Sequence, residues 1–315
     1  MQSRFKPALK DARLAGVLLL GLCLLILTGC ASTPRLAEST QQTLPRQASI
    51  DGVPFHAQRD YQCGPASLAM VLNHGDVDVA MESLIPQVFI PEREGSVQPE
   101  MLATVRRHGR IPFVLDNNFD ALLTEIAAGH PVVVMQNLSL PAWPMWHYAV
   151  AIGYDLGAEE MTLHSGEEAE RIESFRRFDA TWARSERWAF VALPPGELPS
   201  GVGEQSALQA IAAFEQVQGA EITLPAWEAF VERFPGSGMG YFALGNARYT
   251  AGNAAGAIEA LRNAVRQRDD LGAAWLNLGL LLQAQGEDGE ARRALSRAAE
   301  LPGPWQKRAQ DALET

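Results

Sequence analysis

The sequence predicts two folded units in tandem, an α+β domain over residues 50–194 and an all-α domain over residues 205–315. In the first unit, segments with helical periodicity come first and short apolar segments of strand length follow, as in an α+β fold with an antiparallel sheet. In the second unit, small and apolar residues recur every 34 residues, which is typical of stacked helical pairs. A stretch rich in Pro, Gly and Ser, residues 195–204, separates the two units.

The first 30 residues precede the predicted fold. They combine a basic start with an apolar run over residues 14–27, which is short for a membrane span. The run ends in Leu27-Thr28-Gly29-Cys30, which resembles a bacterial lipobox. This resemblance implies that residues 1–30 are a lipoprotein signal peptide and that Cys30 is lipidated; an uncleaved anchor helix is the alternative. Because Ala31 rather than Asp follows, the resemblance also implies sorting to the outer membrane, facing the periplasm.

Residues 31–49 are rich in Ser, Thr, Gln, Ala and Pro, and we interpret them as a flexible tether. A short strand or an extended lead-in is expected at residues 51–55. The formal net charge of the chain is −11, and nothing in the sequence resembles a basic groove with interleaved aromatic residues. We therefore do not expect nucleic acid as a partner.

A cysteine stands directly before the first predicted helix of the α+β unit. Helical spacing of apolar residues predicts this helix over residues 65–74, and Pro65 suits its first turn because the missing N–H is not needed there. Cys63 then lies at the helix N-terminus, where backbone N–H groups and the helix dipole favour a thiolate. Further helices are expected at residues 79–89, broken at Pro86, and at residues 96–108.

Apolar runs of strand length dominate the rest of the α+β unit. We expect strands at residues 110–116, 131–135, 147–154, 160–164 and 188–193, with one more helix at residues 119–128. His147 begins the third of these strands, in the segment Trp146-His147-Tyr148-Ala149-Val150-Ala151-Ile152-Gly153-Tyr154.

Two motifs together resemble those of the papain-fold bacteriocin-processing leader peptidases, also called double-glycine peptidases. In that family a Gln precedes a Cys-Gly-x-Ala-x-Leu segment, which corresponds here to Gln58 and Cys63–Leu68, and a His-led strand with Gly-Tyr follows. The resemblance implies a papain-like α+β fold, with Cys63 as nucleophile and His147 as general base. It covers residues 50–194.

The cysteine count supports a special role for Cys63. The chain has three cysteines, and Cys23 and Cys30 fall in the predicted signal peptide and lipidation site. Cys63 is then left without a disulfide partner. An unpaired thiol is a liability in an oxidising compartment, which favours a nucleophile over the alternative, a buried inert cysteine.

The family resemblance implies that Gln58 donates its amide to the oxyanion. The family's Gln usually stands six residues before the nucleophile and here stands five before it, so Gln62 is the fallback. The family's third catalytic member is an Asp on the strand after the histidine strand, but that strand here ends in His164-Ser165.

Three residues are candidates for this third member: Asn137, Ser165 and Asp155. Asp155 lies at the far end of the His147 strand, and eight residues of strand span about 26 Å, so a direct contact is not expected. A Cys–His dyad without a third member is the other alternative.

The C-terminal unit resembles the tetratricopeptide repeat, with clear repeats over residues 238–271 and 272–305. The matched positions are Tyr241 and Trp275, Leu244-Gly245 and Leu278-Gly279, Gly252 and Gly286, and Ala257 and Ala291. Residues 207–234 form a degenerate first repeat without the Leu-Gly pair. Three repeats are usually the minimum for a stable stack, so a short array could lean on the preceding domain. A plain helical appendage is the alternative.

These features predict a lipid-anchored cysteine peptidase of the cell envelope, which cleaves peptide bonds through a Cys–His acyl-enzyme and recruits a partner or substrate through its repeats. A degenerate peptidase fold kept as an adaptor, and an amidase or transferase on peptidoglycan peptides, are the alternatives. No double-glycine specificity is carried over, because no transporter segment accompanies the domain. No metal or cofactor is expected; His164, Glu167 and Glu168 are interpreted as a solvated turn.

Overall fold

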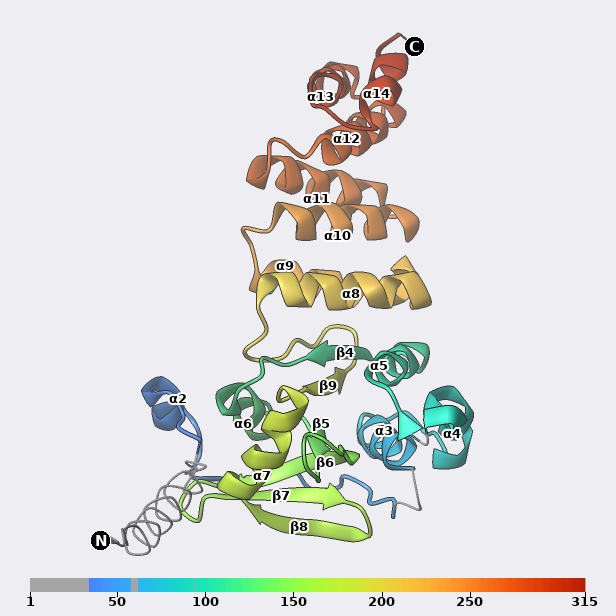
Figure 1. Ribbon diagram of the computed structural model, residues 1–315. Helices are drawn as coiled ribbons and strands as arrows, with labels where there is room; N and C mark the ends of the chain where they lie inside the picture. Colours follow the sequence, from blue (N-terminus) through green and yellow to red (C-terminus); the bar gives the residue numbers. More distant parts are fainter. Residues whose placement is uncertain (1–33, 58–61, 94, 315) are drawn as a thin grey trace, which may run out of the picture.

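The computed structural model describes residues 34–57, 62–93 and 95–314. Helices pack on a mainly antiparallel sheet in the first part of the chain, and a stack of helices rises from one edge of it (Figure 1). The predicted order of an α+β domain followed by an all-α domain is confirmed.

Three helices come first in the α+β part: α3 (Cys63–His74), α4 (Met81–Val88) and α5 (Gln98–Arg107). Nine consecutive residues of α3, from Gly64 to Leu72, are buried, so this helix is enclosed on every side. The predicted break at Pro86 is wrong, because α4 continues through it to the buried Val88. Two short strands, β2 (Phe89–Ile90) and β3 (Gly95–Ser96), flank the 3-10 turn η1 (Pro91–Arg93).

The main sheet has the strand order β4-β9-β5-β6-β7-β8, and all its pairings are antiparallel. Its central strand, β6, pairs with β5 on one side and β7 on the other. Helix α6 (Phe119–Ala127) comes between β4 and β5 in the sequence. Helix α7 (Phe175–Trp182) and the turn η2 (Ala183–Ser185) come between β8 and β9. The strands are β4 (Ile111–Val114), β5 (Val132–Asn137), β6 (Trp146–Asp155), β7 (Glu160–Ser165), β8 (Glu168–Ser174) and β9 (Ala189–Leu193).

The N-terminal part of the domain differs from the prediction. The segment taken as a flexible tether contains helix α2 (Glu38–Thr43) and strand β1 (Gln47–Ser49), which pairs with the end of β6. Of the two forms expected at residues 51–55, the strand is absent, because the chain turns at Gly52, whose φ is +76°. Gly153 makes the pairing with β1 possible, since a Cβ there would lie 2.8 Å from the Ala48 carbonyl oxygen.

A second difference concerns β8 and α7, which were not predicted. The solvated turn expected at His164, Glu167 and Glu168 is present as the tight connection between β7 and β8, where Glu167 and Glu168 are exposed, but His164 differs from the prediction. His164 is buried, with Nε2 3.1 Å from the Val53 carbonyl oxygen, and it accepts the backbone N–H of Glu170 on Nδ1. Its role is therefore structural.

The repeat part consists of helical pairs that stack in sequence order (Figure 1). The two clear repeats begin with α10 at Gly238 and α12 at Gly272, as the sequence period predicts. A Cβ on Gly245 or Gly279 would lie under 3.0 Å from Leu261 or Leu295, so these glycines allow the two helices of each pair to approach closely. The helices are α8 (Glu204–Gln218), α9 (Ala220–Arg233), α10 (Gly238–Thr250), α11 (Ala254–Gln267), α12 (Gly272–Ala284), α13 (Asp288–Glu300) and α14 (Gln306–Leu313).

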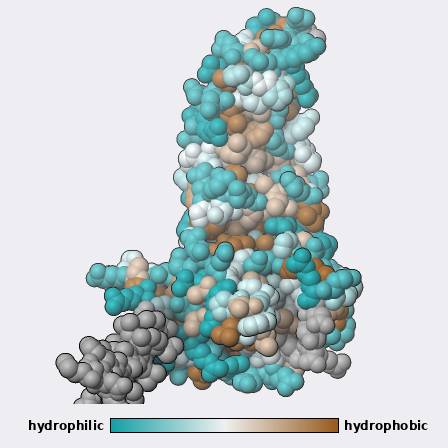
Figure 2. Space-filling view, viewed as in Figure 1, coloured by the Kyte–Doolittle hydropathy of each residue, from teal (hydrophilic) through white to brown (hydrophobic). Residues whose placement is uncertain are grey.

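The degenerate first repeat, α8 and α9, joins the stack to the sheet domain. A single hydrophobic core runs from Ile50 to Ala260, so it includes the sheet and the first helices of the stack. Apolar residues gather at this junction on the face shown in Figure 2. The side-chain amide of Gln218 on α8 donates to the Arg106 carbonyl at the end of α5, at 2.7 Å. None of the helices in the described part of the chain is long and apolar enough to cross a bilayer.

Candidate active site

Cys63 is the first residue of α3 and is half-buried. The following glycine is required by packing, because a Cβ on Gly64 would lie 2.2 Å from Ser96 Oγ on β3. The Cys63 sulfur interacts with the backbone N–H groups of Tyr148, Gly64 and Cys63 itself. Since Tyr148 is the third residue of β6, the thiol lies beside the start of that strand, next to the position of His147.

The protonation state of Cys63 differs from the prediction. Burial raises the pKa of the thiol, and the surrounding N–H groups lower it by less. The loss of hydration at this site therefore outweighs the stabilisation expected from the helix N-terminus. Burial of Cys63 therefore opposes the thiolate that the helix N-terminus is expected to favour.

His147 is the second residue of β6, so a strand of the main sheet holds its backbone in place. Its Nε2 lies 2.9 Å from Ser165 Oγ. Burial, and after it the positive charge of Arg171 on β8, lower the pKa of His147 to about 4. The imidazole is therefore neutral at pH 7, and it has one ring nitrogen in a hydrogen bond with a hydroxyl.

The structure separates the three candidates for the third member. Ser165 ends β7, the strand that follows the histidine strand, and its buried side chain contacts His147. Asn137 Oδ1 instead accepts the N–H groups of Ser139 and Met145, at 3.1 and 3.0 Å. Asp155 lies at the other end of β6 from His147.

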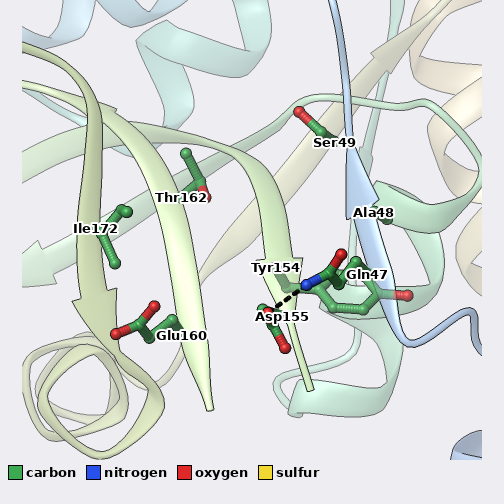
Figure 3. A pocket seen from close by; sticks show the side chains of 8 residues that line it. All are labelled: Gln47, Ala48, Ser49, Tyr154, Asp155, Glu160, Thr162 and Ile172. Atoms are coloured by element: carbon green, nitrogen blue, oxygen red, sulfur yellow. Dashed lines mark hydrogen bonds between the residues drawn. The ribbon is translucent and has the colours of Figure 1, made fainter. Parts of the chain in front are cut away.

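Asp155 belongs to a surface hollow at that other end, drawn in Figure 3. Its side chain accepts hydrogen bonds from Gln47 on β1 and from the backbone of Gly157 and Ala158. The hollow is lined by Gln47, Ala48, Ser49, Tyr154, Asp155, Glu160, Thr162 and Ile172. Neither Cys63 nor His147 lines it, so this hollow is separate from the candidate active site.

Two predicted residues lie outside the described residues: Gln58, the expected oxyanion donor, and Cys30, the expected lipidation site. The fallback donor Gln62 precedes α3, and its side chain does not cap the helix. The roles of all three remain predictions.

Sequence reasoning missed two contributors to the site. Arg171 lies on β8, whose sequence Glu-Ala-Glu-Arg-Ile-Glu-Ser is too polar to be predicted as a strand. Tyr148 supplies an N–H group to the thiol, and its hydroxyl reaches the Ser96 carbonyl at 3.4 Å. The apolar pattern of the β6 sequence places Tyr148 on a predicted strand. Only the fold shows that α3 starts beside this residue. Within the described part of the chain, no group of three His, Cys, Asp or Glu side chains is placed to hold a metal ion.

A family model matches the part of the chain that carries this site. Residues 50–189 match the model of the Peptidase_C39 like family, a span that contains Cys63, His147 and Ser165. No curated protein matches the sequence.

Several solved structures resemble parts of the chain. A C39-like peptidase from Bacillus anthracis is 16% identical over 47% of this chain and 98% of its own, with a TM-score of 0.40. MamA is 22% identical over 35% of this chain, with a TM-score of 0.33, and the chain spans 64% of its length. The type III secretion translocator chaperone SycD of Yersinia enterocolitica is 19% identical over 35% of this chain and 87% of its own, with a TM-score of 0.32.

Proposed function

We propose that the C39-like domain at residues 50–189 is a cysteine peptidase that cleaves peptide bonds through an acyl-enzyme. One observation carries this proposal: Cys63 begins α3 beside the start of β6, where His147 is hydrogen-bonded to Ser165. A nucleophile, a base and a group that orients the base are the parts that this chemistry needs.

The hydrogen bond to Ser165 determines which nitrogen of His147 acts. With Nε2 carrying the hydrogen and donating to Ser165 Oγ, Nδ1 is left to accept a proton. Cys63 Sγ attacks the peptide carbonyl carbon while its proton passes to His147, which then protonates the leaving amine. A water molecule, deprotonated by His147, attacks the resulting thioester and restores the Cys63 thiol.

The resting pair in this mechanism is a neutral thiol and a neutral imidazole. The raised pKa of Cys63 and the lowered pKa of His147 place the proton transfer within the attack step, not before it. Backbone N–H groups of Cys63, Gly64 and Tyr148 then stabilise the charge that develops on the sulfur. The Gln58 amide is our proposed donor to the oxyanion.

The remaining parts of the proposal concern location and partners. We assign Cys30 as a lipid anchor that holds the protein at the outer membrane, facing the periplasm. The helical stack from α8 to α14 is a surface for a protein partner or substrate, since stacked helical pairs present an extended concave face.

One set of observations favours an adaptor as a second candidate function. His147 has a hydroxyl as its partner where the resembling family has a carboxylate, and burial moves the pKa values of Cys63 and His147 away from an ion pair. A degenerate site kept for binding accounts for both features. The two candidates differ in whether Cys63 supports turnover.

The test is hydrolysis of an internally quenched peptide library by the full chain. We expect Cys63→Ala to lower kcat/KM by a factor of about 10³ or more, because the acyl-enzyme cannot form. We expect Ser165→Ala to lower kcat by roughly 3- to 10-fold, the value of one hydrogen bond. Ser39→Ala, at an exposed serine of α2, is the matched control and leaves both parameters unchanged.

Two outcomes contradict the peptidase. Undiminished hydrolysis by Cys63→Ala removes the nucleophile from the proposal. A wild-type chain that cleaves no member of the library, while binding a peptide, supports the adaptor.

A further inference from the structure

The loop between β5 and β6 and the first residue of β6, residues 138–146 together, expose an unusual amount of apolar surface. We call this segment the apolar hairpin; its sequence is Leu-Ser-Leu-Pro-Ala-Trp-Pro-Met-Trp, without a charged residue. Trp143 is 76% exposed and Leu140 is 62% exposed. Ten large hydrophobic side chains are exposed in the described part of the chain, and five of them lie in these nine residues. A gathering of this kind marks a binding surface more often than chance exposure does.

The apolar hairpin is held in shape by polar groups at its base. The Leu138 N–H donates to the Met145 carbonyl at 2.9 Å, and the buried Asn137 side chain accepts two further N–H groups of the loop. Arg184 donates to the carbonyls of Asn137 and Ser139. These bonds fix the two strands of the loop against the sheet domain.

The tip of the apolar hairpin is a tight turn. The Trp143 N–H donates to the Leu140 carbonyl at 3.0 Å, and Pro141 stands at the second position of this turn, where its fixed φ is favourable. The exposed side chains are therefore presented on an ordered support, which reduces the entropy lost when a ligand binds them.

The position of the apolar hairpin connects it to the candidate active site. It runs directly into β6, so that Trp146 is adjacent to His147 in the chain and both begin the same strand. This adjacency puts the apolar hairpin next in the chain to the group that we propose as the base at the scissile bond. An uncharged apolar surface in a chain of net charge −11 suits uncharged apolar side chains rather than a charged ligand.

A membrane surface fits this position less well. β1 pairs with the Asp155 end of β6, which is the end opposite the apolar hairpin. Ten residues of strand separate the two ends by about 33 Å. The described residues that lead into β1 therefore enter the sheet at the end that is away from the apolar hairpin.

We propose that the apolar hairpin is the specificity surface of the peptidase, and that it selects peptides with large apolar side chains, such as Leu or Phe, close to the scissile bond. This inference rests on the proposed function and names its substrate class. Leu140 and Trp143 form the contact, and Met145 and Trp146 extend it toward His147.

The test compares two peptides that differ only in the residues flanking the cleaved bond, Leu-Phe in one and Ser-Ser in the other. The full chain is compared with Leu140→Ser/Trp143→Ser. The control is Ile172→Ser, which removes an equally exposed apolar side chain (64%) from the hollow of Figure 3. Thermal unfolding of each protein checks that it is folded.

We expect the wild type to prefer the Leu-Phe peptide by at least about 10-fold in kcat/KM, since single apolar groups in a pocket contribute 10-fold or more. The double variant should reduce this preference to under about threefold. The loss should come from a higher KM for the Leu-Phe peptide, with its kcat nearly unchanged. Ile172→Ser should retain the wild-type preference. An undiminished preference in the double variant overturns the inference while leaving the peptidase intact.

A binding arm separates failure of the inference from failure of the proposed function. Fluorescein-labelled forms of both peptides are titrated with the Cys63→Ala chain, with and without the hairpin substitutions, and anisotropy is measured. If the wild type cleaves neither peptide, the peptidase proposal fails. The inference that the apolar hairpin binds apolar side chains is then upheld if the Leu-Phe peptide binds, the Ser-Ser peptide does not, and the hairpin substitutions abolish the binding. Equal binding of both peptides overturns the inference. The same proteins are also mixed with vesicles of phosphatidylethanolamine and phosphatidylglycerol, and hairpin-dependent binding to the vesicles but to neither peptide likewise overturns it.

Discussion

Arg171, on a strand two places from that of His147 in the sheet, contributes to the lowered pKa of His147. Burial is the larger cause of the lowered pKa of His147, and the Arg171 cation adds to it by opposing a second positive charge nearby. A general base must be unprotonated to act, so this lowered pKa, about 4, keeps His147 competent through mildly acidic conditions.

Replacing Arg171 should therefore move the acidic limb of the pH–rate profile. In Arg171→Gln the pKa of His147 rises toward its ordinary value because the repulsion is removed, so the limb of kcat/KM shifts to higher pH. Activity at pH 4 relative to pH 7 should fall by about twofold, the effect of a shift of roughly half a unit from a pKa of about 4. Arg177→Gln is the control, since that exposed arginine pairs with Glu173. An acidic limb that stays in place in Arg171→Gln would show that another group is the base.

At the scale of elements, the start of α3 depends on close packing against β3. Gly64 leaves room for Ser96, whose Oγ is buried and has no hydrogen-bond partner among the described residues. The two residues fit because one has no side chain. This contact fixes the helix end that carries Cys63.

A double-mutant cycle should measure this contact. Gly64→Ala should lower the free energy of unfolding by about 1–3 kcal/mol, because the new methyl group overlaps Ser96. Ser96→Gly in the same chain should recover part of that loss, since it removes the overlapping atoms. Urea unfolding measures all four proteins, and Gly95→Ala, where a Cβ would meet only ordinary contacts, is the control. Strictly additive effects would contradict the predicted overlap.

At the scale of the whole molecule, the first helical pair is part of the core of the sheet domain. Phe214 on α8 is fully buried in the same core as the sheet, whereas Leu278 on α12 belongs to a separate core further along the stack. The linker is also fixed, because the buried Glu125 of α6 accepts the Ser200 N–H at 2.8 Å. The stack is therefore joined rigidly to the domain that carries Cys63.

One substitution in the shared core and one in the separate core of the stack should affect activity differently. Phe214→Ala should cost about 3–5 kcal/mol and lower the temperature at which activity is lost, since it opens a cavity in the shared core. Leu278→Ala should cost about 2–5 kcal/mol in the distal repeats and leave that temperature unchanged. Far-ultraviolet circular dichroism and residual activity, recorded on the same heating series, distinguish the two. If both variants leave the activity midpoint unchanged, the core is not shared.

The order of elements was predictable because their sequences have strong periodicity. The apolar runs of β5, β6 and β9 and the repeats at Gly238 and Gly272 were found within a few residues. The polar strand β8 was not found, since its exposed residues carry no alternation of apolar side chains. Strand β1 was missed because its three residues gain their stability from pairing with β6.

The candidate site was only partly predictable for a related reason. Local motifs identified Cys63 and His147, because each stands in a short segment with its own pattern. Ser165 could be named only as one of three candidates, since its contact with His147 depends on how β7 lies beside β6. The raised pKa of Cys63 follows from burial, which is a property of the folded chain.

The register of the helical stack has a consequence for how the gene can change. An extra copy of residues 238–271 placed after residue 271 sets its third residue, a second Gly240, against Ala264, which stands one period after Phe230. Deleting residues 238–271 instead sets Ala274 in the place of Gly240, where a Cβ would lie 2.3 Å from the Phe230 ring. At this contact, duplication of a repeat introduces no overlap, whereas simple deletion requires the Phe230 ring to move, so lengthening the stack disturbs its junction with the first helical pair less than shortening it does.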